Sequence, residues 1–300
     1  MHEIIEELSK LINNIPYGKV TTFKILSEYL GDIYSIKFII NYYKKINGPW
    51  WRVVNSDGVI NNKIQEELLR KEGIEIINNK IVNLEKYLFN NFNVKEKILK
   101  KYRKIQEELA NKIILEDKIN DTNLIGGVDL SYKDDIGYIV YVILDKNLEL
   151  INKYIFKEKV EFPYIPSFLA FREGEPIIKT FNKIKEKIDI LFVNGHGISH
   201  PFKLGLASYI GVKLNIPTIG ITKKLLSGNV IDNKIIINNE VRGYKIEKFG
   251  ETIYSSPGNL ISLEKTKELS EKYWISGKYP EPIRLADMIS KKIKYMEKFP

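Results

Sequence analysis

The chain has 300 residues, of which 44% are hydrophobic, and it contains no cysteine. This length gives room for two domains, each with its own core, and the lack of cysteine excludes disulfides, thiolate metal sites and cysteine nucleophiles. Lys and Arg outnumber Asp and Glu by 47 to 38, and the net charge of +9 favours a polyanionic partner. An AT-rich genome, which favours Lys, Ile and Asn, would produce the same bias.

The first residues, MHEIIEELSKLINNI, follow the pattern of an amphipathic helix with charges throughout. They lack the apolar core of a signal peptide, and no run of about 18 apolar residues follows. We therefore expect a cytoplasmic protein without a membrane segment. Nothing in the sequence demands a dimer, so we expect a monomer.

Residues 1–92 predict a small α+β domain of the winged helix-turn-helix-like kind. Apolar residues at helical spacing occur at 21–30 and 36–43, and the turn between them completes the helix-turn-helix pattern. A small hairpin closed by Asn78 and Asn79 follows. The polar, Lys-rich stretch that begins at residue 90 places the domain boundary near Phe92.

Residues 93–300 predict an α/β domain. Three strand-like runs come first, and apolar strands then alternate with amphipathic helices, the final helix being at 261–274. Consecutive strands followed by strand and helix alternation indicate a mixed sheet flanked by helices.

Asp129 is the first candidate for chemistry in this domain. It lies inside GGVDLSY, an apolar strand that tolerates a carboxylate only when something compensates its charge. A metal ion is one such compensation. The alternative is an aspartate at a strand end, in solvent or in a capping role.

The segment FPYIP holds an aromatic side chain between two prolines. Pro163 and Pro166 restrict the backbone around Tyr164 and Ile165. Tyr164 can therefore serve as a rigid wedge that replaces a lost stacking partner in nucleic acid. A helix-like stretch then reaches Glu173. An ordinary packed surface loop is the alternative.

A buried strand ends abruptly in the glycines and histidines of NGHGISH. Polar residues past the carboxyl end of such a strand are a usual position for function. Gly195 and Gly197 allow close backbone approach to a ligand, while His196 and His200 suit phosphate contact or the orientation of metal ligands. A chance cluster of histidines is the alternative. Lys223 follows another apolar strand and can stabilise charge on phosphate, although one lysine in a Lys-rich chain carries little weight.

From about Lys97 to the end, the chain resembles the endonuclease V family. The motifs that carry the resemblance are GGVDLSY, FPYIPSFLAFRE, NGHGISHPFKLGLASYIGV, PTIGITKKLL, SSPGNLISL and YPEPIRLADMIS, in the family's order. The resemblance implies a ribonuclease H-like fold. It also implies Mg²⁺-dependent cleavage, with Mn²⁺ as a substitute, of the second phosphodiester bond 3′ to deoxyinosine, leaving a 3′-hydroxyl and a 5′-phosphate.

The resemblance also implies roles for individual residues. Asp129 matches the metal-binding aspartate, Glu173 the catalytic glutamate, and Tyr164 the strand-separating wedge, flanked by Pro163, Ile165 and Pro166. The family's basic positions near the scissile phosphate correspond to His200 and Lys223. The residues expected to enclose the flipped base are Ser167, Leu169, Gly195 and Leu226.

Two positions depart from the family pattern. Asn194 stands where an aspartate is usual, and Asn259 stands where a histidine or aspartate is usual in the active site. Mg²⁺ prefers anionic oxygen, so losing a carboxylate weakens metal binding and water activation. Asn194 can still offer its carbonyl oxygen beside Asp129 and Glu173. We therefore expect one dominant metal ion and a reduced activity.

The first ninety residues resemble the DNA-binding half of O6-alkylguanine-DNA alkyltransferases and their alkyltransferase-like relatives. The matching text is IPYGKVTTF, GPWWRVVNSDGVI, QEELLRKEGIEI and IVNLEKYLF. Trp50 takes the place of the alkyl-accepting cysteine and Trp51 that of a histidine, so no alkyl transfer is expected. Lys37 takes the place of the base-stacking arginine, although lysine lacks a planar guanidinium.

We interpret this domain as a module that binds DNA or alkylated guanine. The residues expected to contact the DNA or the lesion are Trp50, Trp51, Lys37, Arg52, Phe23 and Thr22. In the alternative, Trp50 and Trp51 only fill a vestigial pocket and pack the core.

The sequence leaves three functions open. The first is an endonuclease that acts on DNA with deaminated adenine, and also with deaminated guanine or cytosine. Its N-terminal domain binds damage and so raises the local concentration of the enzyme there. The second is a binding protein with a dead metal site that only marks lesions. The third is an endonuclease for inosine in RNA.

Overall fold

The computed structural model describes residues 2–119, 121–133 and 135–296, which fall into two compact units. Unit 1 comprises Met1–Lys104 and Phe162–Pro166, and unit 2 comprises Ile105–Glu161 and Ser167–Pro300. No helix in the described ranges combines the length and the apolar character needed to cross a membrane.

The first division between the units lies inside a helix, α6 (Ile98–Ala110), rather than near Phe92. Phe92 is itself buried in unit 1, where its ring packs against Tyr29 at 4.9 Å between ring centres. The guanidinium of Arg103 then pairs with the Asp32 carboxylate at 2.6 Å. These contacts keep the chain attached to unit 1 beyond the predicted boundary.

Unit 1 is built from short elements. They are α1 (Glu3–Asn13), β1 (Thr21–Thr22), α2 (Phe23–Leu30), η1 (Ile33–Ser35), α3 (Ile36–Tyr42), η2 (Tyr43–Lys45), η3 (Trp50–Arg52), β2 (Val53–Val54), α4 (Lys63–Lys71), β3 (Ile76–Ile77), β4 (Lys80–Ile81) and α5 (Leu84–Tyr87). Helices α2 and α3 confirm the predicted pair, and the Thr22 hydroxyl caps α2 by accepting from the Ile25 N–H at 3.1 Å. Strands β3 and β4 form the predicted hairpin, closed by Asn78 and Asn79 with positive φ.

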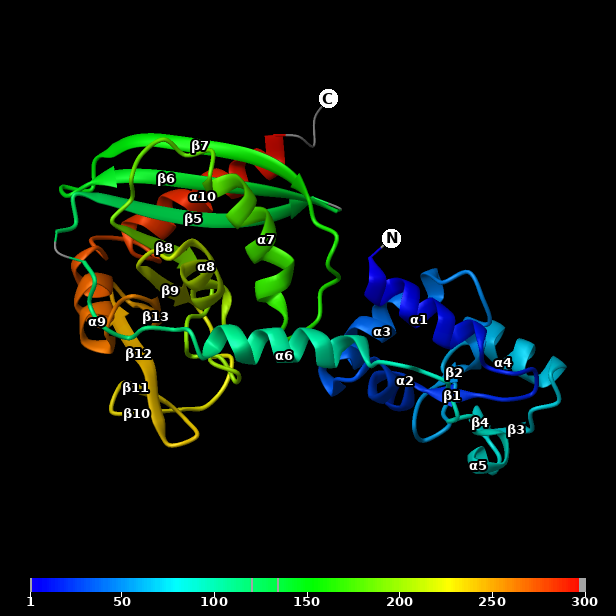
Figure 1. Ribbon diagram of the computed structural model, residues 1–300. Helices are drawn as coiled ribbons and strands as arrows, with labels where there is room; N and C mark the ends of the chain where they lie inside the picture. Colours follow the sequence, from blue (N-terminus) through cyan, green and yellow to red (C-terminus); the bar gives the residue numbers. More distant parts are fainter. Residues whose placement is uncertain (1, 120, 134, 297–300) are drawn as a thin grey trace. The chain divides into compact units, whose positions relative to one another are not determined.

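Unit 2 contains a sheet of nine strands in the order β10-β11-β12-β13-β9-β8-β5-β6-β7 (Figure 1). The strands are β5 (Leu124–Lys133), β6 (Ile136–Asp145), β7 (Leu150–Lys159), β8 (Ile190–Asn194), β9 (Thr218–Thr222), β10 (Asn229–Ile231), β11 (Lys234–Ile237), β12 (Glu240–Lys248) and β13 (Glu251–Asn259). Strands β5, β8 and β9 run parallel, and the others join them antiparallel. The predicted mixed sheet is confirmed.

Helices cover both faces of this sheet. They are α7 (Leu169–Phe181), α8 (Leu206–Leu214), α9 (Leu263–Lys272) and α10 (Glu281–Met296). Side chains alternate along β8, so that Leu191 and Val193 pack with Ala207 of α8, whereas Phe192 points the other way and meets Tyr273. Figure 1 shows α7 and α8 on one side of the sheet and α10 on the other.

The prediction that the final helix lies at 261–274 is wrong, because α10 follows it. Its first turn contains Pro282, and a proline there loses no hydrogen bond, since the first N–H groups of a helix have no partner within it. Arg284 donates its N–H to the Pro280 carbonyl at 2.9 Å and so continues the turn. Helix α10 packs along β5 and β6, where Ala286 meets Val140 and Val142.

Candidate active site

The centre of the candidate site is the Asp129 carboxylate on β5, whose side chain is 8% exposed. Val128 pairs with Val193 in parallel register, and the next residues, Asp129 and Asn194, therefore lie side by side. Asn194 Nδ2 donates to Asp129 Oδ1 at 2.7 Å, and the Ser290 hydroxyl of α10 donates to Oδ2. The carboxylate is thus fixed by residues from two other elements.

Glu173 on α7 is the second acid of the site. Its Oε1 accepts from the Tyr132 hydroxyl at 2.9 Å. Burial raises the pKa of Glu173 to about 7, and the nearby charge of Asp129 adds to the rise despite the bond from Tyr132. Burial likewise raises the pKa of Asp129. Because both carboxyl groups are buried close together, their ionised forms are unfavourable unless a cation lies nearby. The pair therefore forms a candidate cation-binding site.

Asp287 on α10 is a third acid that the sequence reasoning missed. Its charge raises the pKa of Asp129 further, after the larger effect of burial, so the two groups share one electrostatic environment. Asp287 pairs with Lys291 at 2.7 Å. The available signal was the helical spacing of three between Asp287 and Ser290, which places both on one face of α10.

The donor set fits a hard divalent cation. Asp129 and Glu173 offer carboxylate oxygens and Asn194 a carbonyl oxygen, which are the ligands that Mg²⁺ prefers. Among the described residues, no three acidic, histidine or cysteine side chains are grouped as a metal site. In this donor set Asn194 contributes an amide oxygen in place of a carboxylate.

Lys223, after β9, lies in the same electrostatic neighbourhood. Its ammonium pairs with Glu251 at 2.8 Å and sits 4.9 Å from the centre of the Tyr279 ring. Burial, followed by the charges of Asp287 and Asp129, raises the pKa of Tyr279 to about 12. Lys223 is therefore connected to the acids through Tyr279, with its own charge balanced by Glu251.

The glycines and histidines of the loop Gly195–His200 were expected to contact a ligand, but several of them contact the protein itself. A Cβ on Gly197 would overlap the Pro257 carbonyl, so this close backbone approach is to β13 rather than to a ligand. Burial lowers the pKa of His196 to about 4, which keeps its imidazole neutral. His200 is 4% exposed and accepts the Phe202 N–H at Nδ1, at 3.2 Å.

The prediction of an active-site position for Asn259 is wrong. Asn259 pairs with Thr218 at the start of β9, whereas Asn194 pairs with Ile221 near the other end of that strand. Its Oδ1 accepts from the Ile114 N–H and its Nδ2 donates to the Gly211 carbonyl, both at 3.0 Å. Asn259 therefore holds α8 and the segment after α6 to the sheet.

The residues expected to enclose a base lie in unit 2, in different settings. Ser167 is buried with a φ of 66°, and its carbonyl accepts from Gln106 at 3.1 Å. Leu169 begins α7, and Gly195 sits against Leu206. Leu226 is largely exposed in the loop after β9. Their role stays a prediction.

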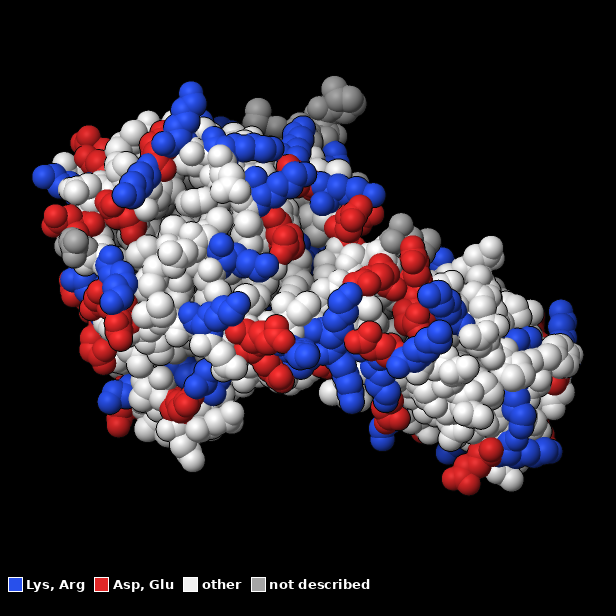
Figure 2. Space-filling model, viewed as in Figure 1, with Lys and Arg blue, Asp and Glu red and all other residues white. Residues whose placement is uncertain are grey.

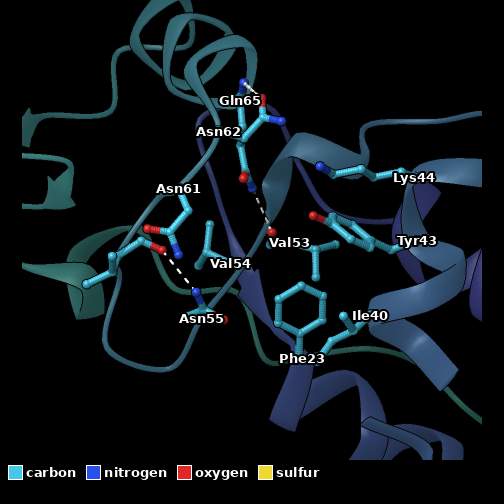
Figure 3. Close-up of a pocket in the computed structure, with 11 residues that line it drawn as sticks. Phe23, Ile40, Tyr43, Lys44, Val53, Val54, Asn55, Asn61, Asn62 and Gln65 are labelled. Atoms are coloured by element: carbon cyan, nitrogen blue, oxygen red, sulfur yellow. Dashed lines mark hydrogen bonds between the residues drawn. The ribbon is translucent and has the colours of Figure 1, made fainter. Parts of the chain in front are cut away.

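Unit 1 contains a pocket of about 230 Å³ (Figure 3). It is lined by Phe23, Ile40, Tyr43, Lys44, Val53, Val54, Asn55, Val59, Asn61, Asn62 and Gln65. Phe23 and Tyr43 meet edge to face at 5.1 Å on one side, and the four amide side chains lie across from them. Aromatic faces opposite hydrogen-bonding amides suit a flat heteroaromatic group.

Trp50 lies next to this pocket, with its ring edge-on to Tyr43 at 6.1 Å and the Lys44 ammonium 5.4 Å from its centre. Trp51 has a different role, because its Nε1 donates to Glu72 at 2.6 Å. Arg52 pairs with the same carboxylate at 2.9 Å and donates to the Ile15 carbonyl. Trp51, Arg52 and Thr22, the cap of α2, therefore all have partners within unit 1, and their contacts with DNA stay a prediction.

We expect Glu72→Gln to destabilise unit 1 by about 3 kcal/mol, because it leaves the Arg52 charge buried without a partner. Burial alone raises the pKa of Glu72, but the hydrogen bonds from Arg52, Trp51 and the Gly18 N–H outweigh it and hold the pKa below 4.5. This contribution is complete above pH 4.5 and is lost as the pH falls through the lowered pKa.

Urea unfolding followed by tryptophan fluorescence checks this prediction, since Trp50 and Trp51 both report on unit 1. The exposed Glu75→Gln is the matched control. Wild-type stability should fall in acid more steeply than that of Glu72→Gln. Equal unfolding midpoints for wild type and Glu72→Gln would contradict the role of this carboxylate.

The fold and the site together define a class of protein. A mixed sheet with a buried aspartate on the interior strand β5, a glutamate from a covering helix and oxygen donors from both fits a metal-dependent nuclease. Residues 107–288, more than half of the chain, match the family described as Endonuclease V. The chain belongs to the endonuclease V family and is a deoxyribonuclease of that type. Residues 3–74 match the 6-O-methylguanine DNA methyltransferase, DNA binding domain.

Two similar proteins span nearly the whole chain. A bifunctional methyltransferase-like/endonuclease of Nanoarchaeum equitans is 41% identical over 288 residues, which are 96% of this chain and 90% of that protein. A bifunctional methyltransferase/endonuclease of Picrophilus torridus is 36% identical over 298 residues, covering 95% and 94%. The order of the two parts is therefore shared with these relatives.

Solved structures resemble the nuclease part. Endonuclease V of Bacillus subtilis is 27% identical with a TM-score of 0.63, covering 70% of this chain and 98% of that one. Endonuclease V of Ciona intestinalis, in complex with a 24mer DNA containing an inosine followed by a ribo-adenosine, is 27% identical with a TM-score of 0.58. That match covers 66% of this chain and 98% of the other.

Proposed function

We propose that this enzyme repairs DNA by cutting the second phosphodiester bond 3′ to deoxyinosine with Mg²⁺, leaving a 3′-hydroxyl and a 5′-phosphate. The observation that carries the proposal is the pair of acids Asp129 and Glu173, which share one environment and whose pKa values are both raised by burial. The Ciona relative, whose structure holds inosine-containing DNA, supports the choice of substrate.

In this proposal Asp129, Glu173 and the Asn194 carbonyl hold one Mg²⁺, for which Mn²⁺ can substitute. A bound divalent cation lowers the pKa of its water and balances charge on the phosphate. The chain's own residues supply the positioning. Ser290 and Asn194 fix Asp129, and Tyr132 orients Glu173 through its hydroxyl. Preorganised groups of this kind need not reorient during the reaction.

We further propose that unit 1 holds the DNA and takes a nucleobase, such as an alkylated guanine, into the pocket of Figure 3. Phe23 and Tyr43 offer aromatic surface, and Asn55 and Asn62 offer amide groups to the edge of a base. Lys and Arg alternate with Asp and Glu over the face drawn in Figure 2. Recognition on this face therefore depends on the shape of local sites more than on a continuous basic patch.

The direct test is cleavage of a duplex that contains one deoxyinosine, analysed on a denaturing gel with Mg²⁺, with Mn²⁺ and with chelator. We expect one nick, at the second bond 3′ to the lesion, only when a divalent metal is present. The same duplex with deoxyadenosine in place of deoxyinosine is the control.

Lesion binding without a nick at any protein concentration would reject the enzyme and leave a lesion-binding protein. A parallel RNA strand with one inosine separates the two nucleic acids as substrates. If the RNA strand is cleaved faster than the DNA duplex, inosine in RNA is the substrate instead.

A further inference from the structure

The segment Phe162–Pro166, which carries the predicted wedge, is part of compact unit 1. The Phe162 ring packs against His2 at 5.0 Å and Tyr102 at 5.1 Å between ring centres, and Ile165 is 1% exposed. Between these two anchors, Tyr164 is 49% exposed. The segment therefore presents one aromatic ring at the surface of unit 1, with its neighbours fixed.

Lys37 is a cation that lies beside this ring. It is an exposed residue of α3, and its ammonium lies 6.0 Å from the centre of the Tyr164 ring. Ile33, Tyr34 and Ile40, at helical spacing from Lys37, are exposed as well. Helix α3, with the sequence IKFIINY, contains no acid.

Asp32, which caps η1 beside Ile33 and Tyr34, is already paired with Arg103. An exposed ring beside a cation and these side chains therefore fits nucleic acid better than protein or small anions. Aromatic rings stack on bases whatever their sequence, and apolar side chains enter between base steps. A lysine beside the ring can neutralise a phosphate, which is the dominant charge of the backbone. The partner that matches all three features is a nucleic acid duplex in which one base step is unstacked.

We infer that Lys37 and Tyr164 act as one strand-opening tip. Tyr164 enters the stack in place of the displaced base, and Lys37 neutralises the phosphate next to the opened step. The inference rests on the proposed function and on the wedge role that the family resemblance implies for Tyr164. It makes unit 1 part of the device that opens the lesion, in addition to any base that its pocket takes.

The test uses the full chain, chelator to prevent cleavage, and a duplex with 2-aminopurine next to deoxyinosine. Stacked 2-aminopurine is quenched, so its fluorescence reports opening rather than cutting. The variants are Tyr164→Ala, Lys37→Ala, their combination and Lys37→Arg. Lys80→Ala, which removes an exposed lysine from the β3–β4 hairpin, is the matched control for lost charge.

We expect each alanine variant to lower the fluorescence rise at saturating protein several-fold. The double variant should be no more than about twofold worse than Tyr164→Ala, because residues that act as a unit are not additive. Lys37→Arg and Lys80→Ala should match wild type.

Two results would overturn the inference while leaving the wedge intact. In one, Lys37→Ala behaves as Lys80→Ala does, although Tyr164→Ala loses the signal. In the other, the two single effects multiply in the double variant. Full fluorescence with Tyr164→Ala would instead remove the wedge role of Tyr164, and the inference with it, while the proposed cleavage by Asp129 and Glu173 would stand.

Discussion

Asp129→Ala is expected to reduce cleavage of deoxyinosine DNA by at least about 10²-fold, the loss typical of removing one essential charge-stabilising group. The variant removes the central oxygen donor and the acceptor that both Asn194 and Ser290 use. Binding of the DNA in chelator should change little, because this carboxylate does not attract phosphate. Single-turnover cleavage and a binding titration measure the two effects separately.

Stability distinguishes a lost catalytic group from a misfolded protein. A buried carboxylate whose pKa is raised costs the folded state free energy, so its removal should leave the melting temperature unchanged or higher. Asp121→Ala, an exposed aspartate before β5, is the matched control and should cleave as wild type does. Cleavage by Asp129→Ala within tenfold of wild type would show that the metal-binding role is assigned to the wrong residue.

Asn194→Asp is expected to lower the Mg²⁺ concentration needed for half-maximal cleavage by about tenfold, the effect of one improved ligand. The amide now donates to Asp129 at 2.7 Å, and a carboxylate there would place like charges together. Without metal this pair repels, so the variant should melt at a lower temperature than wild type in chelator. With Mg²⁺ the order should reverse, because the ion binds only the folded state.

Melting curves and cleavage rates across a Mg²⁺ series check both the loss of stability in chelator and the gain with metal. Asn111→Asp adds the same charge at an exposed position after α6 and should change neither measurement. Faster cleavage by wild type at every Mg²⁺ concentration would show that the amide is the better group at this position.

Much of the fold could be predicted because its signals are local. Alternation and apolar runs predicted β5 to β9, and a threonine before FKILSEYL predicted the start of α2. For the site, Asp129 and Asn194 were predictable because both follow apolar residues of neighbouring parallel strands. The parallel register then brings Asn194, at the end of β8, beside Asp129, inside β5.

The errors occur at residues whose surroundings are determined by contacts with distant parts of the chain. Asn259 follows a family motif, but the antiparallel register of β13 carries it to the far end of β9. Asp287 approaches Asp129 only through the packing of α10. Arg52 reads as a surface cation, yet Glu72, distant in sequence, neutralises it inside unit 1. The spacing of Asp287 and Ser290 shows that they share one face of α10, but the sequence does not show which strand that face meets.

The hydrogen bond from Ser290 to Asp129 spans 161 positions of the chain. During synthesis, the strand that carries Asp129 therefore exists long before the helix that completes its surroundings. A nascent chain can form β5 to β9 with Asp129 beside Asn194 and still lack both Ser290 and Asp287. Closing so long a stretch of chain costs conformational entropy, so contacts of this range are slow to form. The surroundings of Asp129 are therefore complete only when α10 has docked on the sheet.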